Sequence, residues 1–309
     1  MSGLPIRVLM ESRNPRFSAH RSRRGPLASL AHDKAYHMLG KNVTNAPSHS
    51  SGQPRPAITV VGFGACIITG YPVSEEAGFL RMAIAHAESE VDAEIKYSIV
   101  TLTACPAPKA AECLEEKVFP YHPDIVVLQF GQSDAKIGVR RVWNEVLGRR
   151  SISKPQPQVL NKPAGLANRL NAFWRGCAGL ALGARPVTSR ADYRQSISQM
   201  VDAVVSVGAY PIVFTPFVFD NFLSDAWARC YSCDIVADFA GRADVCVMDG
   251  WRLLAPYPRN KILLHDGLHL SQLAHEVLAQ PLKVKLVEWI RAHPFRGPGR
   301  TQSCAHDVG

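Results

Sequence analysis

Short apolar runs alternate with amphipathic stretches between residues 57 and 290, and this alternation predicts the fold class. The apolar runs predict five strands, at 58–63, 97–103, 124–130, 211–219 and 245–248. The stretches with helical spacing predict helices at 74–91, 109–118, 189–207, 224–240 and 271–290. Strands that alternate with helices in this way form a parallel sheet with helices on both faces. The sequence therefore predicts a single α/β domain.

Ligands of parallel sheets bind at the carboxyl ends of the strands, so the residues just after each strand are candidates for chemistry. Three segments in such places carry reactive or hydrogen-bonding side chains: 64–72 (GACIITGYP), 131–134 (GQSD) and 265–271 (HDGLHLS). We expect these segments to meet at one edge of the sheet.

A cysteine, a histidine and an aspartate in these segments can form a nucleophilic site. Two plainer interpretations stay open: a turn followed by a helix-capping histidine, and a buried core thiol.

In this order, the three segments resemble the motif blocks of the SGNH/GDSL hydrolases, which are serine esterases and lipases. The resemblance covers about residues 58–290 and implies a flavodoxin-like three-layer α/β/α sandwich with a parallel five-stranded sheet. It implies that His269 would be the general base, and that Asp266 would fix the histidine tautomer and stabilise its charged form. Cys66 would stand in the place of the family's serine as nucleophile, with its thiolate favoured by a helix N-terminus and a nearby histidine. The resemblance also implies oxyanion or substrate-binding roles for the residues Ser133, Gly131 and Gly64.

The chain departs from the family pattern in each of the first three blocks. Gly-Asp-Ser is replaced by Gly64-Ala65-Cys66, and the asparagine of Gly-x-Asn-Asp is replaced by Ser133. The glycine expected after the second strand has no clean counterpart near Ala104. Loss of one oxyanion donor typically costs about 3 kcal/mol of transition-state stabilisation, although the Cys66 backbone N–H remains available.

Two functions therefore stay open. One is a hydrolase or acyltransferase for an acyl ester or thioester on a carbohydrate or lipid. The other is a degenerate binding or scaffolding protein that keeps the pocket without turnover. Nucleotide binding is disfavoured, because the turn 62–67 has two glycines but lacks the third of a dinucleotide fingerprint. We expect no cofactor and no metal site, since Cys230 and Cys233 lack a second ligand pair.

The net charge of +9 is unevenly distributed, and its distribution argues against nucleic-acid binding. Residues 1–56 carry +7 and residues 135–190 carry +10, which leaves −8 for the rest. We expect a basic, mostly disordered tail (1–56), one domain (57–292) with a basic lid-like insertion (135–190), and a C-terminal tail (293–309). The insertion contains an amphipathic helix, 166–182, predicted to pack as a lid, to contact an anionic or membrane surface, or both.

The eight cysteines are dispersed along the chain, which favours reduced thiols over a disulfide framework. An apolar run of about twenty residues is absent from the sequence, as is the apolar core of a secretory signal. These features predict a cytoplasmic protein. The alternatives are organellar targeting through the basic N-terminus and a peripheral place at a membrane.

Overall fold

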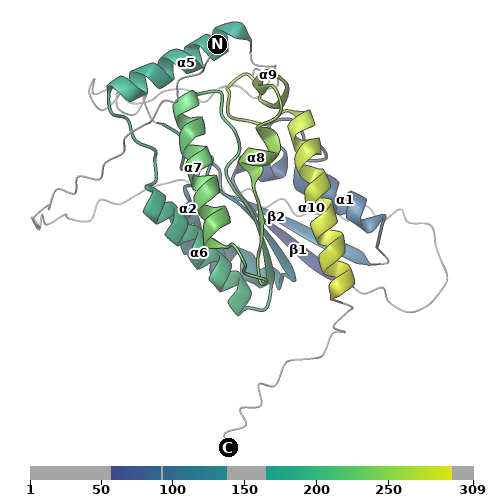
Figure 1. Ribbon diagram of the computed structural model, residues 1–309. Helices are drawn as coiled ribbons and strands as arrows, with labels where there is room; N and C mark the ends of the chain where they lie inside the picture. Colours follow the sequence, from purple (N-terminus) through teal and green to yellow (C-terminus); the bar gives the residue numbers. More distant parts are fainter. Residues whose placement is uncertain (1–56, 92, 138–164, 294–309) are drawn as a thin grey trace, which may run out of the picture. The chain divides into compact units, whose positions relative to one another are not determined.

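The computed structural model describes residues 57–91, 93–137 and 165–293 (Figure 1). The predicted tail 1–56, the C-terminal tail beyond His293 and residues 138–164 of the predicted insertion lie outside the described residues. In the described part of the chain, no helix is long and apolar enough to cross a membrane.

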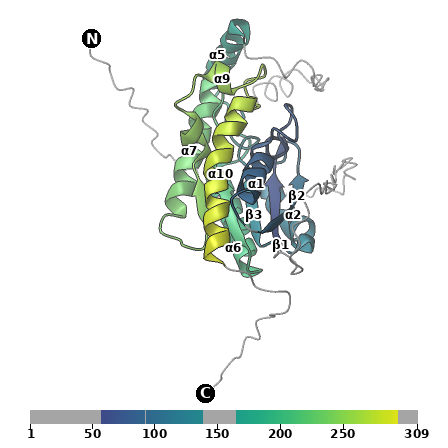
Figure 2. The same cartoon turned by 90° about the vertical axis from the view of Figure 1, so that its right-hand side faces the viewer.

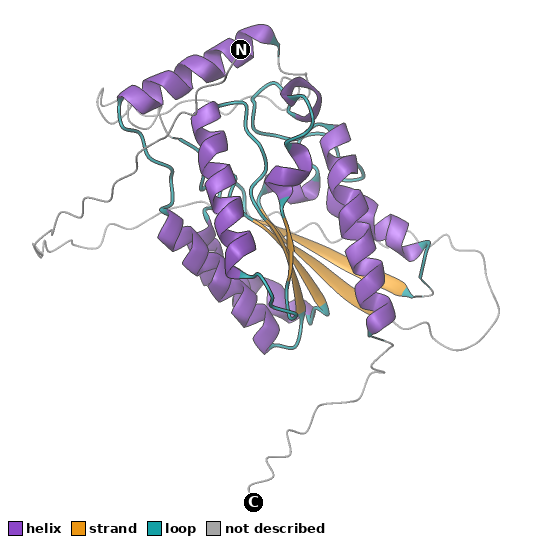
Figure 3. Ribbon diagram, in the orientation of Figure 1, coloured by secondary structure: helices purple, strands orange, loops and turns teal. Residues whose placement is uncertain are grey.

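Five parallel strands form one sheet in the order β2-β1-β3-β4-β5, which confirms the predicted fold class (Figure 3). The strands are β1 (Ala57–Gly64), β2 (Glu94–Thr101), β3 (Ile125–Gln129), β4 (Tyr210–Phe214) and β5 (Cys246–Met248). The chain passes from β1 to β2 on one side of it and then crosses to β3 on the other side of β1. The crevice where ligands bind in such sheets therefore lies at the carboxyl ends of β1 and β3.

Helices cover both faces of the sheet (Figures 1 and 2). One face is covered by α1 (Phe79–Glu88) and α10 (Gln272–Ala292). The other face is covered by α2 (Ala107–Val118), α6 (Arg190–Ser206) and α7 (Phe222–Asp238). Because both faces are covered, the central strands are apolar at nearly every position instead of alternating with polar residues.

The central strand β3 shows how one strand supplies both cores. Ile125 and Val127 pack in the core beneath α1 and α10, while Val126 and Leu128 pack in the core beneath α2, α6 and α7. All four side chains are completely buried. At about 25 cal/mol per Å² of apolar surface, burial of each such side chain contributes about 2 kcal/mol. This rigid strand fixes the position of the turn that follows it.

Within the described residues, five further helical elements lie outside these two layers. They are η1 (Cys66–Thr69), η2 (Phe119–Tyr121), α5 (Leu166–Ala181), α8 (Gly250–Leu254) and α9 (Arg259–Ile262). Of these, η1 begins directly after β1 and α5 belongs to the predicted insertion. These two bear on the candidate site and its surroundings.

The predicted start of the first helix is wrong. The helix begins at Phe79 after the N-cap Gly78, whereas the prediction began it at residue 74. The Ser74 hydroxyl instead accepts the N–H of Ala77 at 3.1 Å and closes a separate turn. The reason lies in Gly70, where a Cβ would come within 2.1 Å of the Ser74 carbonyl oxygen. The chain folds back on itself here, so the helix starts only after this close contact.

Two strand boundaries also differ from the prediction. The strand expected at 211–219 ends at Phe214, and the apolar residues Phe217, Val218 and Phe219 are buried in an irregular segment. Burial under neighbouring helices therefore explains their apolar character. The second strand lies at Glu94–Thr101, three residues earlier than its predicted start.

Candidate active site

Cys66 is held at the sheet edge by a close contact between β1 and β3. The N–H of Ala65 donates to the Gln129 carbonyl at 3.1 Å, which extends the pairing one residue beyond the strand. Gly64 is required here, because a Cβ would lie 2.7 Å from the same carbonyl oxygen. The chain then turns into η1, and Cys66 is its first residue.

A single carboxylate organises the loop that carries His269. Asp266 Oδ1 accepts the backbone N–H groups of Leu268 and His269, each at 3.0 Å. Gly267 between them has φ +66°, a backbone conformation that side-chain-bearing residues rarely adopt. A Cβ at this glycine would also come within 2.7 Å of the Cβ of Asp220. The Asp-Gly sequence therefore fixes a tight turn, and this turn positions the histidine.

The three predicted catalytic residues lie in one hydrogen-bonded row. His269 Nδ1 lies 2.5 Å from Asp266 Oδ2, and His269 Nε2 lies 3.2 Å from Cys66 Sγ. Because a carboxylate only accepts hydrogen bonds, Nδ1 carries a proton and Nε2 faces the sulfur. Cys66 and His269 are 203 positions apart in the sequence, so this contact results from the fold.

The electrostatics of the row favour a charged histidine. Burial alone lowers the pKa of His269, but its hydrogen bonds with Asp266 and Cys66 and their negative charges raise this pKa to about 9. Burial likewise raises the pKa of Asp266, yet the hydrogen bond and charge of His269 outweigh it and leave that pKa below its usual value. The row thus holds a histidine that favours its protonated form between the Asp266 carboxylate and the Cys66 sulfur.

Tyr71 lies beside this row, a feature that the sequence analysis did not assign. Its ring meets the His269 ring edge to face, with centroids 5.3 Å apart. Burial raises the pKa of the Tyr71 hydroxyl, as do the charges of Cys66 and Asp266. The only sequence signal was its place next to Pro72, in the segment after β1.

The turn after β3 contains the other predicted site residues. Gly131 has φ +112°, and a Cβ there would lie 2.3 Å from Pro216 Cγ. Gln132 accepts the N–H of Phe217 at 2.7 Å. Ser133 is half-buried, and among the described residues its hydroxyl has no hydrogen bond to Cys66 or His269. The turn is thus tightly built, while the Ser133 hydroxyl is not part of the row.

Asp134, the last residue of this turn, has a structural role. Its Oδ1 accepts the N–H of Ala107 at 2.9 Å and the hydroxyl of Thr188 at 2.6 Å. The side chain is completely buried, and this burial raises its pKa despite the hydrogen bonds. One carboxylate therefore connects the β3 turn, the start of α2 and the segment before α6.

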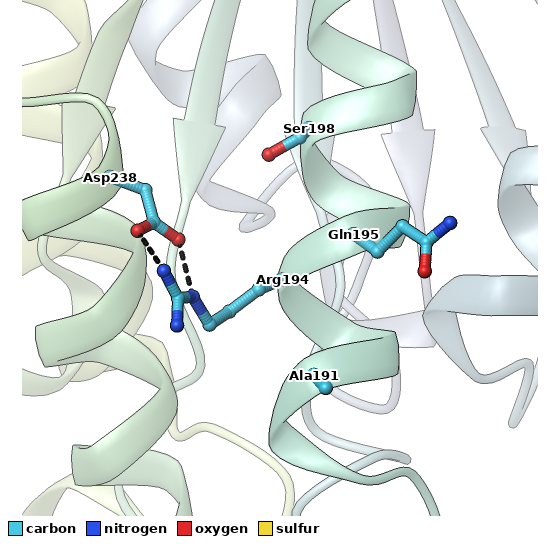
Figure 4. Close-up of a pocket in the computed structure, with 5 residues that line it drawn as sticks. All are labelled: Ala191, Arg194, Gln195, Ser198 and Asp238. Atoms are coloured by element: carbon cyan, nitrogen blue, oxygen red, sulfur yellow. Dashed lines mark hydrogen bonds and ion pairs between the residues drawn. The ribbon is translucent and has the colours of Figure 1, made fainter.

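A surface pocket elsewhere on the molecule lacks comparable chemistry. It lies between α6 and α7, and an ion pair between Arg194 and Asp238 at 2.5 Å forms part of its wall (Figure 4). Its lining residues are Ala191, Arg194, Gln195, Ser198 and Asp238. They include one hydroxyl but no histidine to activate it. The Cys66 row is therefore the stronger candidate for a catalytic site.

Comparison with protein-family models gives no match to this sequence, and comparison with curated proteins gives none either. Solved structures do match. The lipase Lip_vut3 from a goat rumen metagenome has a TM-score of 0.52 and 11% identity, over 74% of this chain and 97% of its own. TesA has a TM-score of 0.50 and 12% identity, over 74% of this chain and 99% of its own. A lipase/acylhydrolase from Enterococcus faecalis has a TM-score of 0.49 and 18% identity, over 77% of this chain and 99% of its own.

This chain has the SGNH/GDSL hydrolase fold. The predicted flavodoxin-like three-layer α/β/α sandwich with five parallel strands is confirmed. At these identities the likeness concerns the fold alone. Chemistry must therefore be argued from the residues of this chain.

The SGNH/GDSL pattern has a glycine in the loop after β2. This chain lacks the glycine there but has a residue with positive φ. Ala104 lies in this loop, near the expected glycine, and has φ +53°. Glycine adopts that left-handed conformation without steric cost, whereas alanine is strained by about 1 kcal/mol. The loop thus retains the conformation that a glycine favours, although the glycine itself is missing.

Proposed function

We propose that this protein hydrolyses acyl esters or thioesters through a covalent intermediate on Cys66. The observation that carries the proposal is the row of Cys66 Sγ, the His269 ring and Asp266 Oδ2, with contacts of 3.2 and 2.5 Å. Nucleophile, base and orienting carboxylate within hydrogen-bond reach are the requirements for acyl transfer. Carbohydrate and lipid acyl groups are the substrate class that we propose.

In the first proposed step, the Cys66 thiolate attacks the acyl carbon and forms a C–S bond. The bond between the acyl carbon and the leaving oxygen or sulfur then breaks. With a pKa of about 9, His269 is protonated at neutral pH, so its Nε2 proton can pass to the leaving group. The products of this step are an acyl-Cys66 thioester, a released alcohol or thiol, and neutral His269.

In the second proposed step, water replaces the alcohol. Neutral His269 removes a proton from the water, whose oxygen attacks the thioester carbon. The C–S bond breaks, the carboxylic acid leaves, and the imidazolium–thiolate pair is restored. Asp266 stays ionised throughout, because the pKa of its carboxyl is lowered. If an acceptor hydroxyl replaces the water, the same steps give an acyltransferase.

Stabilisation of the oxyanion is the weaker part of the proposed mechanism. The backbone N–H of Cys66 is one donor, since the first N–H groups of a helix lack intrahelical partners. Ser133 would supply the second, with a shorter side chain than the asparagine of the family pattern. Gly64 and Gly131 would let the backbone approach the substrate closely.

A second candidate function is binding without turnover. Ala65 in place of aspartate and Ser133 in place of asparagine favour it. The first replacement removes a carboxylate, and the second exchanges an amide donor for a shorter hydroxyl. In that case the pocket would hold an acyl compound or another partner, and Cys66 would not react.

Labelling with an acyl-like electrophile tests the proposal. We expect Cys66 of the wild type to be labelled, and an acyl-enzyme adduct to appear by mass spectrometry with an activated thioester. Cys66→Ala should abolish both, and His269→Ala should slow labelling about a hundredfold or more. Cys233→Ala is the matched control, because Cys233 is an exposed thiol on α7 and its removal should change neither rate.

The binding alternative makes the opposite forecast. Wild-type Cys66 would react no faster than Cys233, and no ester or thioester would turn over. That result would reject the proposed hydrolase.

A further inference from the structure

Helix α5 lies at the carboxyl edge of the sheet, across the end of α7 (Figures 1 and 3). Asn221 at the start of α7 donates to the Ala172 carbonyl at 3.1 Å. Gly176 lets the helix approach Phe222, since a Cβ there would be 2.4 Å from the Phe222 ring. Asn168 contacts the ring and the carbonyl of His265. The face of α5 that meets the domain is therefore made mainly of small and polar residues, with the Phe173 ring at its border.

The opposite face of α5 is apolar and exposed. Leu166 is 73% exposed, Trp174 66% and Leu180 65%. Leu170 and Phe173 are about half exposed. With 3.6 residues per turn, Leu170 and Trp174 lie nearly opposite Ala172. Phe173 and Leu180 lie at the border of this face, where the Phe173 ring is 5.8 Å from the Phe222 ring. A contiguous exposed apolar surface of this kind marks an interaction site.

The charges around this face select the kind of partner. Residues 165–190 contain four arginines and no aspartate or glutamate. Arg169 lies 3.7 Å from Asp220 and is about half exposed. Arg175 and Arg185 are exposed and have no ion pair within the described part of the chain. Arg190 pairs with Asp234. The apolar stripe together with the unpaired Arg175 and Arg185 is complementary to a surface with an apolar interior and negative headgroups.

Other occupants of the face are disfavoured by the same charges. A symmetric pair of α5 faces would bring arginines close to arginines, with no carboxylate in 165–190 to compensate. Residues 138–164 are another candidate occupant, but they carry six lysines and arginines and one glutamate. Their net positive charge is repelled by the arginines of 165–190. An anionic partner satisfies both the apolar and the basic positions.

We propose that the outward face of α5 binds the surface of an anionic phospholipid bilayer. Leu166, Leu170 and Trp174 enter the boundary between headgroups and acyl chains, and the arginines pair with the lipid phosphates and carboxylates. The binding does not depend on turnover at Cys66. It would bring the bilayer near the candidate site, because Asn168 of α5 contacts His265, the residue before Asp266.

Vesicle binding by the full-length chain tests this proposal. The wild type should float with vesicles of phosphatidylcholine plus phosphatidylserine, and binding should weaken as salt rises. The double variant Leu170→Glu, Trp174→Glu should bind at least about tenfold more weakly. The matched control is Val236→Glu, Val284→Glu, which changes two exposed apolar residues on α7 and α10 and should bind like the wild type. Unchanged circular dichroism and thermal midpoints establish that all variants are folded.

The fluorescence of Trp174 adds a local readout. The emission difference between the wild type and Trp174→Phe should shift to the blue with anionic vesicles only. Three results would overturn the proposal: equal vesicle binding by the α5 double variant, equal binding to pure phosphatidylcholine, or a Trp174 that is shielded from a dissolved quencher before vesicles are added. A wild-type dimer that the α5 double variant converts to monomers would assign the face to a second copy instead.

Discussion

Cys66 and His269 form a pair whose charge state suits sulfur better than oxygen. The contact with Cys66 is among the causes that raise the pKa of His269 to about 9, so the histidine holds its proton at neutral pH. A serine would need a neutral histidine to remove its proton, whereas a thiolate needs only a neighbouring positive charge. Cysteine at this position is thus consistent with a protonated partner.

Ser133 gives a residue-scale prediction about the oxyanion site. Replacing Ser133 with asparagine restores the amide donor of the family pattern. We expect kcat/KM for an activated ester to rise about tenfold or more, which corresponds to about 1.4 kcal/mol of transition-state stabilisation. The control Ser198→Asn changes a serine in the pocket between α6 and α7 and should leave the rate unchanged. An unchanged rate for Ser133→Asn would remove Ser133 from the proposed mechanism.

At the scale of elements, Asp134 connects parts of the fold that are far apart in sequence. Its carboxylate accepts hydrogen bonds from the N–H of Ala107 at the start of α2 and from the hydroxyl of Thr188 before α6. Its backbone carbonyl accepts the N–H of Val187 at 2.9 Å. A buried carboxylate in this position orients the β3 turn, and therefore Ser133, relative to the helices on one face.

Removal of this carboxylate should destabilise the protein. Asp134→Ala leaves the Ala107 N–H and the Thr188 hydroxyl buried without a partner, and we expect a loss of about 2–4 kcal/mol in the free energy of unfolding. Asp134→Asn keeps the acceptor oxygen and should lose less than half of that. Denaturant titration measures both. The exposed Asp202, changed to alanine, should shift stability by no more than about 0.5 kcal/mol; an equal loss in all three would contradict the connecting role.

Local sequence signals predicted several of these elements, and tertiary contacts decided the rest. Ser189 and Ser271 were predicted to start helices, and each hydroxyl accepts a backbone N–H from the first turn. Ser74 has the same local signal, yet the contact between Gly70 and Gly78 places the helix start at Phe79. Helix starts could be predicted from a capping serine where no contact between residues farther along the chain shifts the start of the helix.

The candidate site shows the same division. Its three motif residues could be predicted, because each follows a buried strand or precedes the last helix. Tyr71 could not, since its contact with His269 depends on how two loops pack. For α5 the periodicity predicted an amphipathic helix but not its orientation. Packing decided that, because Gly176 allows an approach to Phe222 that larger residues would prevent.

For the whole molecule, the His269 row links stability to pH. The folded-state pKa of His269, about 9, exceeds its unfolded value of about 6.5. Folding therefore favours the protonated histidine. The resulting stabilisation is complete below about pH 6.5 and is lost as pH rises through 9.

This linkage predicts a difference between wild type and a variant that cannot titrate at this position. From pH 6.5 to 9, the wild type should lose up to roughly 3 kcal/mol of unfolding free energy relative to His269→Asn, because each pKa unit corresponds to about 1.4 kcal/mol. Denaturant titrations across this range give the difference directly. Parallel curves for the two proteins would show that His269 is neutral in the folded state and would remove the imidazolium from the proposed mechanism.

The hydrogen bonds of Asp266 have a consequence for how this site can change over evolutionary time. The aspartate holds its own loop through the backbone N–H groups of Leu268 and His269. Within the described residues, the hydrogen bonds of the histidine side chain go to Cys66 and Asp266, and neither of them holds the backbone of the loop. A lineage that abandoned chemistry could discard the histidine and keep its loop, but discarding the aspartate would unravel the turn. The histidine is therefore the better marker of the proposed chemistry in any relative of this chain. An aspartate that is present without the histidine indicates only that the turn is kept.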